Sequence, residues 1–362
     1  MPKIRVLVVD DSVVIRKVVS SILTAAPGIE VAGTAANGKI ALAKIDQLNP
    51  DLITLDIDMP VMGGLETLAE IRKERPHLPV VIVSGLTARG AEATFDALAL
   101  GASAYVTKPL IQENAEDAIS SVRDDLIPLV RGLCQSADES LLDSQTSTNS
   151  IPFDAAAASG EQKRVDILAI GVSTGGPNAL AELMPALPAD IPVPIVIVQH
   201  MPPVFTQYLA KRLNGDCKIQ VREGVENATL EPGTCWIAPG DFHMTVEKRD
   251  DRAVLGLNEG PQENHCRPAV DVLFRSVAET FGARSLSLVM TGMGQDGLLG
   301  CKVLREKGGQ VLAQNEESSV IWGMPGCVSR AGLAEKTLPL SELGREIMER
   351  VAFGRRRSSI TG

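Results

Sequence analysis

The sequence lacks several features that would place it in a broad class at once. Its six cysteines are scattered and form no C-x-x-C pair, so neither a common zinc motif nor a disulfide framework is indicated. Unpaired cysteines suit a reducing compartment, and we expect free thiols and a cytoplasmic protein. Positive charge is also scarce. With 35 Lys and Arg against 45 Asp and Glu, the net charge of −10 argues against general nucleic-acid binding.

Long apolar runs are missing as well. No stretch approaches the ~18 apolar residues that a membrane-spanning helix needs. A strand pattern, in place of the apolar core of a signal peptide, begins within the first residues. We therefore expect no secretory leader and no direct membrane insertion. The composition that is present, 44% hydrophobic and 22% charged, is ordinary for globular proteins, and 362 residues suffice for two domains with separate cores.

Residues 1–125 alternate five times between an apolar strand and an amphipathic helix. Five such units predict an α/β domain with a parallel sheet covered on both faces. The strands are predicted at 5–9, 30–35, 52–55, 80–83 and 104–106, and the helices at 13–25, 39–47, 65–75, 91–100 and 114–126. Ligands of such sheets bind outside the carboxyl ends of the strands, where we look for a site.

Polar residues stand at these carboxyl ends. Asp10 and Asp11 follow the first strand, Asp56 the third, Ser84 the fourth and Lys108 the fifth. Three neighbouring carboxylates repel one another, and a hard cation such as Mg²⁺ relieves that repulsion. Lys108 and Ser84 can then bind the oxygens of a phosphoryl group. Helix caps and surface ion pairs would explain one aspartate, but not the full set, so the pattern predicts a magnesium-dependent phosphoryl site.

Residues 4 to about 123 resemble the receiver domain of two-component response regulators. The motifs that carry the resemblance are Val9-Asp10-Asp11-Ser12, Leu55-Asp56-Ile57-Asp58-Met59-Pro60, Gly63-Gly64 and Thr107-Lys108-Pro109. The resemblance implies a flavodoxin-like (βα)5 fold and a phosphoryl group accepted by Asp56 from a histidine kinase.

The same resemblance assigns roles to the other residues of this region. Asp11 and Asp56 would bind Mg²⁺ together with the backbone carbonyl of Asp58, and Asp10 would complete the acidic pocket. Ser84 and Tyr105 would stand at the family's switch positions, and Lys108 would contact the phosphoryl group.

Hydrophobic periodicity fades in residues 126–164. The segment 136–160 is rich in Ser, Thr and Ala and has little capacity to bury a core, so we predict a flexible linker. Its acidic residues are explained by solvation, and nothing in the segment demands a docking role. The linker would separate a first domain at 1–125 from a second at 165–355.

Residues 165–355 are predicted to form a doubly wound, mainly parallel α/β domain. Buried strands are expected at 167–170, 195–199, 286–291 and 310–313, and helices at 179–186, 205–213, 270–281, 297–307 and 343–351. Shorter strands at 235–238, 244–247 and 254–257 are predicted to be antiparallel, with turns at Pro239-Gly240 and Asp250-Asp251.

A glycine-rich turn, Gly171-Val-Ser-Thr-Gly-Gly-Pro177, follows the first of these strands and precedes a helix. Free N–H groups at a helix N-terminus can stabilise an oxyanion, which favours Ser173 as a nucleophile. The letters fit G-x-S-x-G, but the following Gly-Pro is unlike the lipase elbow, so this match is weak. The alternative is an ordinary turn in which Ser173 and Thr174 cap the helix.

Two more residues stand near strand ends in this half. His200 directly follows strand 195–199, and Asp296 lies beyond strand 286–291. A serine needs a neighbouring base, histidine serves near neutral pH, and an aspartate fixes its tautomer. Parallel strands bring these three ends to one edge, which predicts a Ser173–His200–Asp296 triad. Its chain order differs from that of α/β-hydrolases.

Each of these residues has a simpler explanation when taken singly. His200 is equally a histidine satisfied at a strand end, and Asp296 is equally the N-cap of a helix that begins at Gly297. His243 and His265 are alternative bases, and Asp271 is an alternative acid in the first turn of a helix. Only their joint occurrence with Ser173 favours the triad.

Residues 165 to about 350 resemble the catalytic domain of chemotaxis protein-glutamate methylesterases. The motifs are Gly171–Pro177, Gln199-His-Met-Pro-Pro203, Ala238-Pro-Gly240, Arg267–Phe274, Thr291–Gly297 and Trp322-Gly-Met-Pro325. The resemblance assigns the triad to Ser173, His200 and Asp296, and associates Thr174 and Met293 with the oxyanion.

The combined resemblance implies a phosphorylation-activated esterase that needs no cofactor for its hydrolytic step. Its substrates would be glutamyl methyl esters of methyl-accepting chemotaxis receptors, cleaved to glutamate and methanol, and it would also deamidate receptor glutamine. Two alternatives remain: a non-catalytic response regulator whose second domain binds a partner, and a serine hydrolase of another substrate. The Arg355-Arg356-Arg357 tail and Gly326-Cys327 are not explained by the family.

Overall fold

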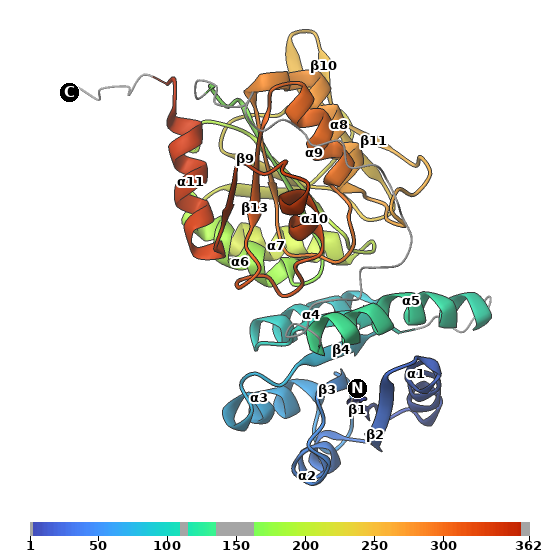
Figure 1. Ribbon diagram of the computed structural model, residues 1–362. Coiled ribbons are helices and arrows are strands. Elements are labelled where there is room, and N and C mark those ends of the chain that lie inside the picture. The colour runs from blue at the N-terminus through green and yellow to red at the C-terminus, as the bar shows by residue number, and fades with distance from the viewer. Residues whose placement is uncertain (1–2, 109–114, 135–162, 356–362) are drawn as a thin grey trace. The chain divides into compact units, whose positions relative to one another are not determined.

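The computed structural model describes residues 3–108, 115–134 and 163–355. The chain forms two compact units, residues 1–144 and 145–362 (Figure 1). Most of the predicted linker, residues 135–162, lies outside the described residues. Within those ranges, no helix combines the length and the apolar character that crossing a membrane requires.

A five-stranded parallel sheet forms the first unit, as predicted, in the order β2-β1-β3-β4-β5. The strands are β1 (Ile4–Val9), β2 (Ile29–Ala35), β3 (Leu52–Asp56), β4 (Val80–Ser84) and β5 (Ala104–Thr107), and the helices are α1 (Val13–Ala25), α2 (Gly38–Leu48), α3 (Gly64–Glu74), α4 (Ala88–Ala99) and α5 (Ala115–Cys134). Helix α1 packs beside α5, and α3 beside both α2 and α4. Right-handed crossovers in this strand order place these two groups on opposite faces of the sheet.

Helix α5 extends further than the sequence predicted. It continues past Leu126 and through Pro128 to Cys134. Leu126, Leu129 and Val130 are buried. Burial of such side chains contributes about 1.5–3 kcal/mol each, which offsets the backbone hydrogen bond that Pro128 cannot donate. The predicted end at Leu126 is wrong. Pro128 and the polar segment that follows are typical of a helix end, so the apolar face of the last turns was not recognised in the sequence.

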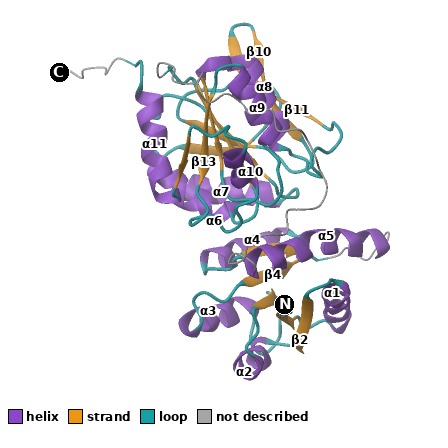
Figure 2. Ribbon diagram, in the orientation of Figure 1, coloured by secondary structure: helices purple, strands orange, loops and turns teal. Residues whose placement is uncertain are grey.

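The second unit contains a seven-stranded parallel sheet in the order β14-β13-β12-β6-β7-β9-β8, together with a separate two-stranded hairpin (Figure 2). The sheet strands are β6 (Ile167–Val172), β7 (Ile195–Gln199), β8 (Gln220–Glu223), β9 (Thr234–Ile237), β12 (Ser285–Val289), β13 (Gln310–Gln314) and β14 (Lys336–Leu338). The hairpin strands are β10 (His243–Arg249) and β11 (Arg252–Asn258). The helices are α6 (Gly176–Leu183), α7 (Phe205–Asp216), α8 (Val270–Phe281), α9 (Leu298–Glu306), α10 (Met324–Arg330) and α11 (Leu340–Ala352), with 3-10 turns η2 (Met184–Ala186) and η3 (Gly282–Arg284).

Strand β9 overturns one expectation. The sequence predicted an antiparallel strand at 235–238, but β9 pairs in parallel with both β7 and β8. A four-residue apolar run carries no signal of direction, and the nearby Pro239-Gly240 turn suggested a hairpin. The β10–β11 hairpin is antiparallel as predicted and turns at Asp250 and Asp251, whose φ angles are 46° and 65°. Strands β8 and β14 were not predicted, because they are short and mostly not buried.

The central strand β6 lies between β7 and β12, where the chain's path across the sheet reverses. All residues of β6, β7 and β12 are buried, which explains why their sequences are mainly apolar, with exceptions such as the small Ser285 and Ser287 of β12. Helix α6 packs against both α7 and α11, and α9 packs with α8 and α10. Loops that leave neighbouring strands at such a reversal form the ligand crevice of a doubly wound sheet.

Candidate functional site

The strand register places Ser173 beside His200. Val172 and Gln199 are the last paired positions of β6 and β7, so Ser173 and His200 are the next residues of neighbouring strands. The His200 N–H donates to the Val172 carbonyl at 3.2 Å. On the opposite side of β6, a Cβ added at Gly292 would lie 2.8 Å from the Ser173 Cβ, so a glycine lets this loop approach. The three predicted strand ends do converge.

The turn that carries Ser173 is tightly packed. A Cβ at Gly176 would lie 1.9 Å from Gln199 Oε1, and one at Gly175, where φ is +78°, would lie 2.6 Å from Val320. The Ser173 N–H donates to the Thr291 carbonyl at 3.0 Å, and the Ser173 carbonyl accepts from Gly176 N–H at 2.8 Å. Gln199 Nε2 donates to the same carbonyl at 2.9 Å. The backbone around Ser173 is therefore fixed by its neighbours.

The loop after β12 is joined to this turn by Thr291. Its hydroxyl donates to the Thr174 carbonyl at 2.9 Å, and its N–H donates to Gln314 Oε1 at 2.8 Å. Among the hydrogen bonds of the described residues, none gives the N–H of Thr174 or of Met293 a protein acceptor. Both residues are half-buried, so these two N–H groups keep donor capacity for a ligand.

His200 and Asp296 form a buried pair. His200 Nε2 lies 2.7 Å from Asp296 Oδ2, and the Asp296 side chain is only 2% exposed. Burial alone would raise the pKa of Asp296, but the hydrogen bond and charge of His200, together with the N–H groups of Asp271 and Val270, outweigh it and hold that pKa below its ordinary value. Burial alone would lower the pKa of His200, whereas hydrogen bonds to Asp296 and Cys266 raise it to about 10. Each member stabilises the charged form of the other.

Asp296 also accepts four further hydrogen bonds. Its Oδ2 accepts from Val270 N–H at 2.6 Å, and its Oδ1 accepts from the N–H groups of Asp271 and Gly297, both at 3.0 Å. Asn264 Nδ2 donates to Oδ1 at 2.9 Å. The carboxylate therefore caps helix α8 from a distant loop, where the positive end of the helix stabilises its charge.

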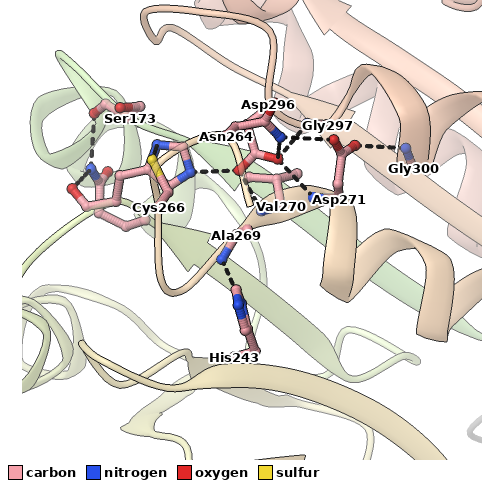
Figure 3. A network of polar contacts seen from close by, with 12 residues as sticks. Ser173, His243, Asn264, Cys266, Ala269, Val270, Asp271, Asp296, Gly297 and Gly300 are labelled. Carbon is pink, nitrogen blue, oxygen red and sulfur yellow. Dashed lines mark hydrogen bonds and ion pairs between the residues drawn. The ribbon is translucent and has the colours of Figure 1, made fainter. Parts of the chain in front are cut away.

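This arrangement decides between two interpretations of Asp296. Helix α9 begins at Leu298 and its N-cap is Gly297, so Asp296 is not the N-cap of the helix that follows it. Its carboxylate points instead to His200 and to the first N–H groups of α8 (Figure 3). The geometry is that of a group which orients an imidazole.

The alternative base and acid residues either make other contacts or lie at the surface. His243 is buried; its Nδ1 accepts from Ala269 N–H at 3.2 Å and its Nε2 donates to the Pro261 carbonyl at 2.8 Å. His265 is exposed. Asp271 Oδ1 accepts from Gly300 N–H at 2.6 Å, and burial raises its pKa. His243 and Asp271 therefore support the loops around the site.

One residue of the site was missed by the sequence analysis. In the described part of the chain, no hydrogen bond joins the Ser173 hydroxyl to His200; His200 Nδ1 instead lies 3.6 Å from Cys266 Sγ (Figure 3). Cys266 follows the exposed His265 in a loop without regular periodicity. The sequence feature that could have indicated Cys266 was its position directly before the motif that begins at Arg267.

The acidic residues of the first unit also gather as predicted. Carboxylate oxygens of Asp10, Asp11 and Asp56 all lie within 4.8 Å of one another, a donor set that suits a hard divalent cation. Lys108 Nζ lies 3.0 Å from Asp10 Oδ2 and 2.7 Å from Asp56 Oδ2. Burial raises the pKa of Asp56, and Lys108 opposes this. The side chain of Asp58 lies apart at the surface, 3.5 Å from Arg89.

The two predicted switch residues contact different parts of the first unit. Ser84 is buried at the end of β4, and its hydroxyl donates to the Gly90 carbonyl in the first turn of α4 at 3.1 Å. Tyr105 is half-buried on β5, and burial raises its pKa, with the charge of Asp125 on α5 adding to the effect. A change at either residue would reach a helix of this unit.

Two family models match the chain. The response regulator receiver domain matches residues 6–120, and the CheB methylesterase model matches residues 168–347. A protein-glutamate methylesterase/protein-glutamine glutaminase of Trichodesmium erythraeum is 50% identical over 361 residues, covering 97% of this chain and 100% of that protein. One of Nocardioides sp. is 48% identical over 357 residues, covering 97% and 96%.

A solved structure agrees with these matches. The CheB methylesterase catalytic domain of Thermotoga maritima is 37% identical, with a TM-score of 0.51, and covers 52% of this chain and 99% of that one. With the convergence of Ser173, His200 and Asp296 and the acidic cluster at Asp56, these matches show that the chain belongs to the protein-glutamate methylesterase/protein-glutamine glutaminase family, with a receiver domain preceding a CheB methylesterase domain.

Proposed function

We propose that this chain hydrolyses glutamyl methyl esters of chemotaxis receptors, releasing methanol, and deamidates receptor glutamine by the same route. The proposal rests on one observation. His200 and Asp296 form a pair 2.7 Å apart, and Ser173, which follows β6, lies beside His200, which follows the neighbouring strand β7. The names of the relatives, protein-glutamate methylesterase/protein-glutamine glutaminase, support this substrate class.

Ser173 is the nucleophile and His200 the general base. Asp296 occupies Nε2 of His200, so Nδ1 is the nitrogen left to take the serine proton. The Cys266 Sγ contact, 3.6 Å from Nδ1, is one of the interactions that raise the pKa of His200. Exchanging it for a contact with the Ser173 hydroxyl therefore both frees Nδ1 and favours the neutral imidazole that can accept a proton. As Ser173 Oγ attacks the ester carbonyl, the N–H groups of Thr174 and Met293 donate to the developing oxyanion.

The tetrahedral intermediate then collapses. The imidazolium of His200 returns its proton to the leaving methoxide, methanol departs, and Ser173 holds the glutamyl group as an acyl-enzyme. Water, activated by the same imidazole, releases free glutamate. For a glutamine substrate the leaving group is ammonia and the remaining steps are identical.

The test is methanol release from methylated receptor. We expect turnover by the wild type, none above background by Ser173→Ala, and loss in His200→Ala on the order of 10⁴–10⁶ in kcat. His243→Ala is the matched control, because it removes a buried imidazole of the same unit that does not face Asp296. Turnover that survives His200→Ala but not His243→Ala would contradict the assignment of the base. A fully active Ser173→Ala protein would favour a non-catalytic output domain or another nucleophile.

The first unit regulates the esterase in this proposal. We propose that a histidine kinase phosphorylates Asp56, with Mg²⁺ held by Asp11, Asp56 and the backbone carbonyl of Asp58, and with Asp10 completing the pocket. Lys108, already 2.7 Å from Asp56, would pair with the added phosphoryl oxygens. Bound Mg²⁺ would neutralise the charge of the phosphoryl group during transfer.

Phosphorylation is proposed to raise esterase activity. Typical coupling free energies of 1–3 kcal/mol correspond to about 5–150-fold activation. We expect a small-molecule phosphodonor with Mg²⁺ to activate the full-length wild type by a factor in this range and to leave Asp56→Asn unchanged. Equal activation of Asp56→Asn would contradict this role for Asp56.

A further inference from the structure

Six cysteines occur in the chain, and one of them contacts the base of the proposed triad. Cys266 Sγ lies 3.6 Å from His200 Nδ1, on the opposite side of the ring from Asp296. Cys266, His200 and Asp296 thus form a continuous thiol–imidazole–carboxylate chain. This is the arrangement that activates cysteine thiols, because the imidazole takes the thiol proton and the carboxylate stabilises the resulting imidazolium.

The loop holds Cys266 in this position. Glu263 N–H donates to the Cys266 carbonyl at 3.1 Å, and Cys266 N–H donates to the Glu263 carbonyl at 2.9 Å, closing a tight turn. Asn264 and His265 form the tip of the turn with φ angles of 52° and 62°. The Asn264 side chain then ties the turn to Asp271 and Asp296 at 3.0 and 2.9 Å. The contact between thiol and imidazole is therefore built into the loop.

The other cysteines differ from Cys266. Burial raises the pKa of the Cys134 thiol to about 12, that of Cys217 to about 11, and that of Cys235 and Cys301 as well, so their reactive thiolates are disfavoured. Cys327 is half-buried, 3.6 Å from the Arg330 guanidinium and 3.7 Å from the Gly294 carbonyl. It is the natural control, because it is a half-buried thiol next to a cation but without an imidazole.

We propose that Cys266 is a site of reversible oxidation by hydrogen peroxide, and that its oxidation switches off the esterase. The inference rests on the proposed role of His200. The Cys266 proton passes to His200 Nδ1, and the thiolate sulfur attacks one oxygen of the peroxide. An S–O bond forms, the O–O bond breaks, and the departing hydroxide takes the proton from the imidazolium to leave as water. Sulfur is oxidised by two electrons to the sulfenic acid, and the peroxide is reduced.

The oxidised sulfur group then blocks Nδ1 of His200, the nitrogen that acts as the base. A sulfenic acid hydroxyl beside Nδ1 can hydrogen-bond to it, and a sulfenate can pair with the imidazolium, so His200 no longer accepts the proton of Ser173. Excess thiol restores the enzyme, since one thiol displaces water from the sulfenic acid to form a mixed disulfide and a second thiol reduces that disulfide. The loss of activity is therefore expected to be reversible by dithiothreitol until further oxidation to the sulfinic acid.

The test treats the full-length protein with hydrogen peroxide at pH 7 in the presence of dimedone and locates the adduct by peptide mass spectrometry. We expect the adduct on the peptide that contains Cys266, formed equally fast in Ser173→Ala. In His200→Gln we expect it to form roughly tenfold more slowly, because the imidazole 3.6 Å from the sulfur is then missing and cannot take the thiol proton. Because the labelling reaction requires neither Ser173 nor turnover of an ester, its result is independent of whether the esterase proposal holds.

Activity provides the second measurement. After peroxide and removal of excess oxidant, the wild type and Cys327→Ser should each lose at least about tenfold of their own untreated activity and recover it with dithiothreitol. Cys266→Ser should keep its own untreated activity. If Cys266→Ser fails to fold, as judged by circular dichroism, the labelling of the wild type still decides the matter. An unlabelled Cys266, an adduct confined to Cys327, or equal peroxide loss in a folded Cys266→Ser protein would overturn the proposal.

Discussion

The substitution Asp296→Asn tests the central pair most sharply, because all five partners of this carboxylate are donors. Oδ2 faces His200 Nε2 and Val270 N–H, and Oδ1 faces Asn264 Nδ2 and the N–H groups of Asp271 and Gly297. An amide must place its NH₂ against one of these two sets. If the NH₂ faced the three donors that surround Oδ1, three N–H groups would have no acceptor. The NH₂ should therefore turn toward His200.

The expected losses of activity and stability follow from that orientation of the amide. In the Asp296→Asn variant, an amide NH₂ directed at Nε2 of His200 makes Nε2 the acceptor and moves the imidazole proton to Nδ1, the nitrogen that must accept the serine proton. The wrong tautomer should lower kcat by roughly 10⁴. Val270 N–H also loses its acceptor, which should cost about 1–3 kcal/mol of folding free energy, because a buried donor is left unpaired.

The pH dependence of stability should change with the same substitution. In the wild type the pKa of His200 is raised from 6.5 to about 10, so the stability it contributes is fully present below pH 6.5 and is lost as the pH rises through 10. The pKa of Asp296 is lowered from 3.8, so its contribution is present above that value and is lost as the pH falls below it. With the carboxylate replaced by an amide, the contribution of Asp296 disappears and that of His200 shrinks to the part that Cys266 supports, so the fall in stability from neutral to alkaline pH should become shallower.

The assay combines methanol release with urea unfolding at neutral and alkaline pH. Asp271→Asn is the matched control: it is the same change on a neighbouring buried carboxylate that accepts from Asn264 and Gly300 but not from His200. It should lose stability without the roughly 10⁴-fold loss in kcat. Activity of Asp296→Asn within about tenfold of the wild type, or equal losses in both variants, would refute the reasoning.

Three further outcomes are expected. Asp56→Asn should abolish acid-labile phosphate after incubation with a phosphodonor and Mg²⁺, and equal labelling would refute its role as acceptor. Gly176→Ala should lower the free energy of unfolding by about 1–3 kcal/mol, because its Cβ would lie 1.9 Å from Gln199 Oε1; Gly215→Ala, with open space at that position, is the control and should show no loss. Asn264→Ala should lower kcat and destabilise the protein, since Asp296 and Asp271 lose a shared donor, and an unchanged pH profile and melting temperature would argue against this bridge.

Much of the fold was predictable because its information is local. Helices α1 and α8 were predicted with the bounds that the structure shows, since each begins and ends where a clear amphipathic pattern does. The buried strands β6 and β7 were visible as apolar runs, and β12 as a mainly apolar segment. The direction of β9 was not, because it depends on which strands lie beside it. Pro128 likewise hid the end of α5, whose burial is a tertiary property.

The candidate site was predictable to the same extent. Ser173, His200 and Asp296 follow strands of one parallel sheet, so their approach follows from topology alone. What the sequence does not contain is the orientation of the side chains. That Asp296 holds the N–H groups of α8, and that Cys266 rather than Ser173 contacts Nδ1, depends on loops that fold back from distant parts of the chain.

The side chains that hold the Ser173 turn in place determine how the site responds to salt. Gln199, Gln314 and Thr291 hold this turn to its neighbouring loops, and all three side chains are electrically neutral. Added salt screens interactions between charges, but it leaves hydrogen bonds between neutral groups largely unaffected. Ionic strength should therefore affect how an acidic or basic receptor segment arrives at the site, while the position of the nucleophile stays the same. A salt series measured on a small uncharged ester should be flat, and any slope found with the receptor would belong to docking.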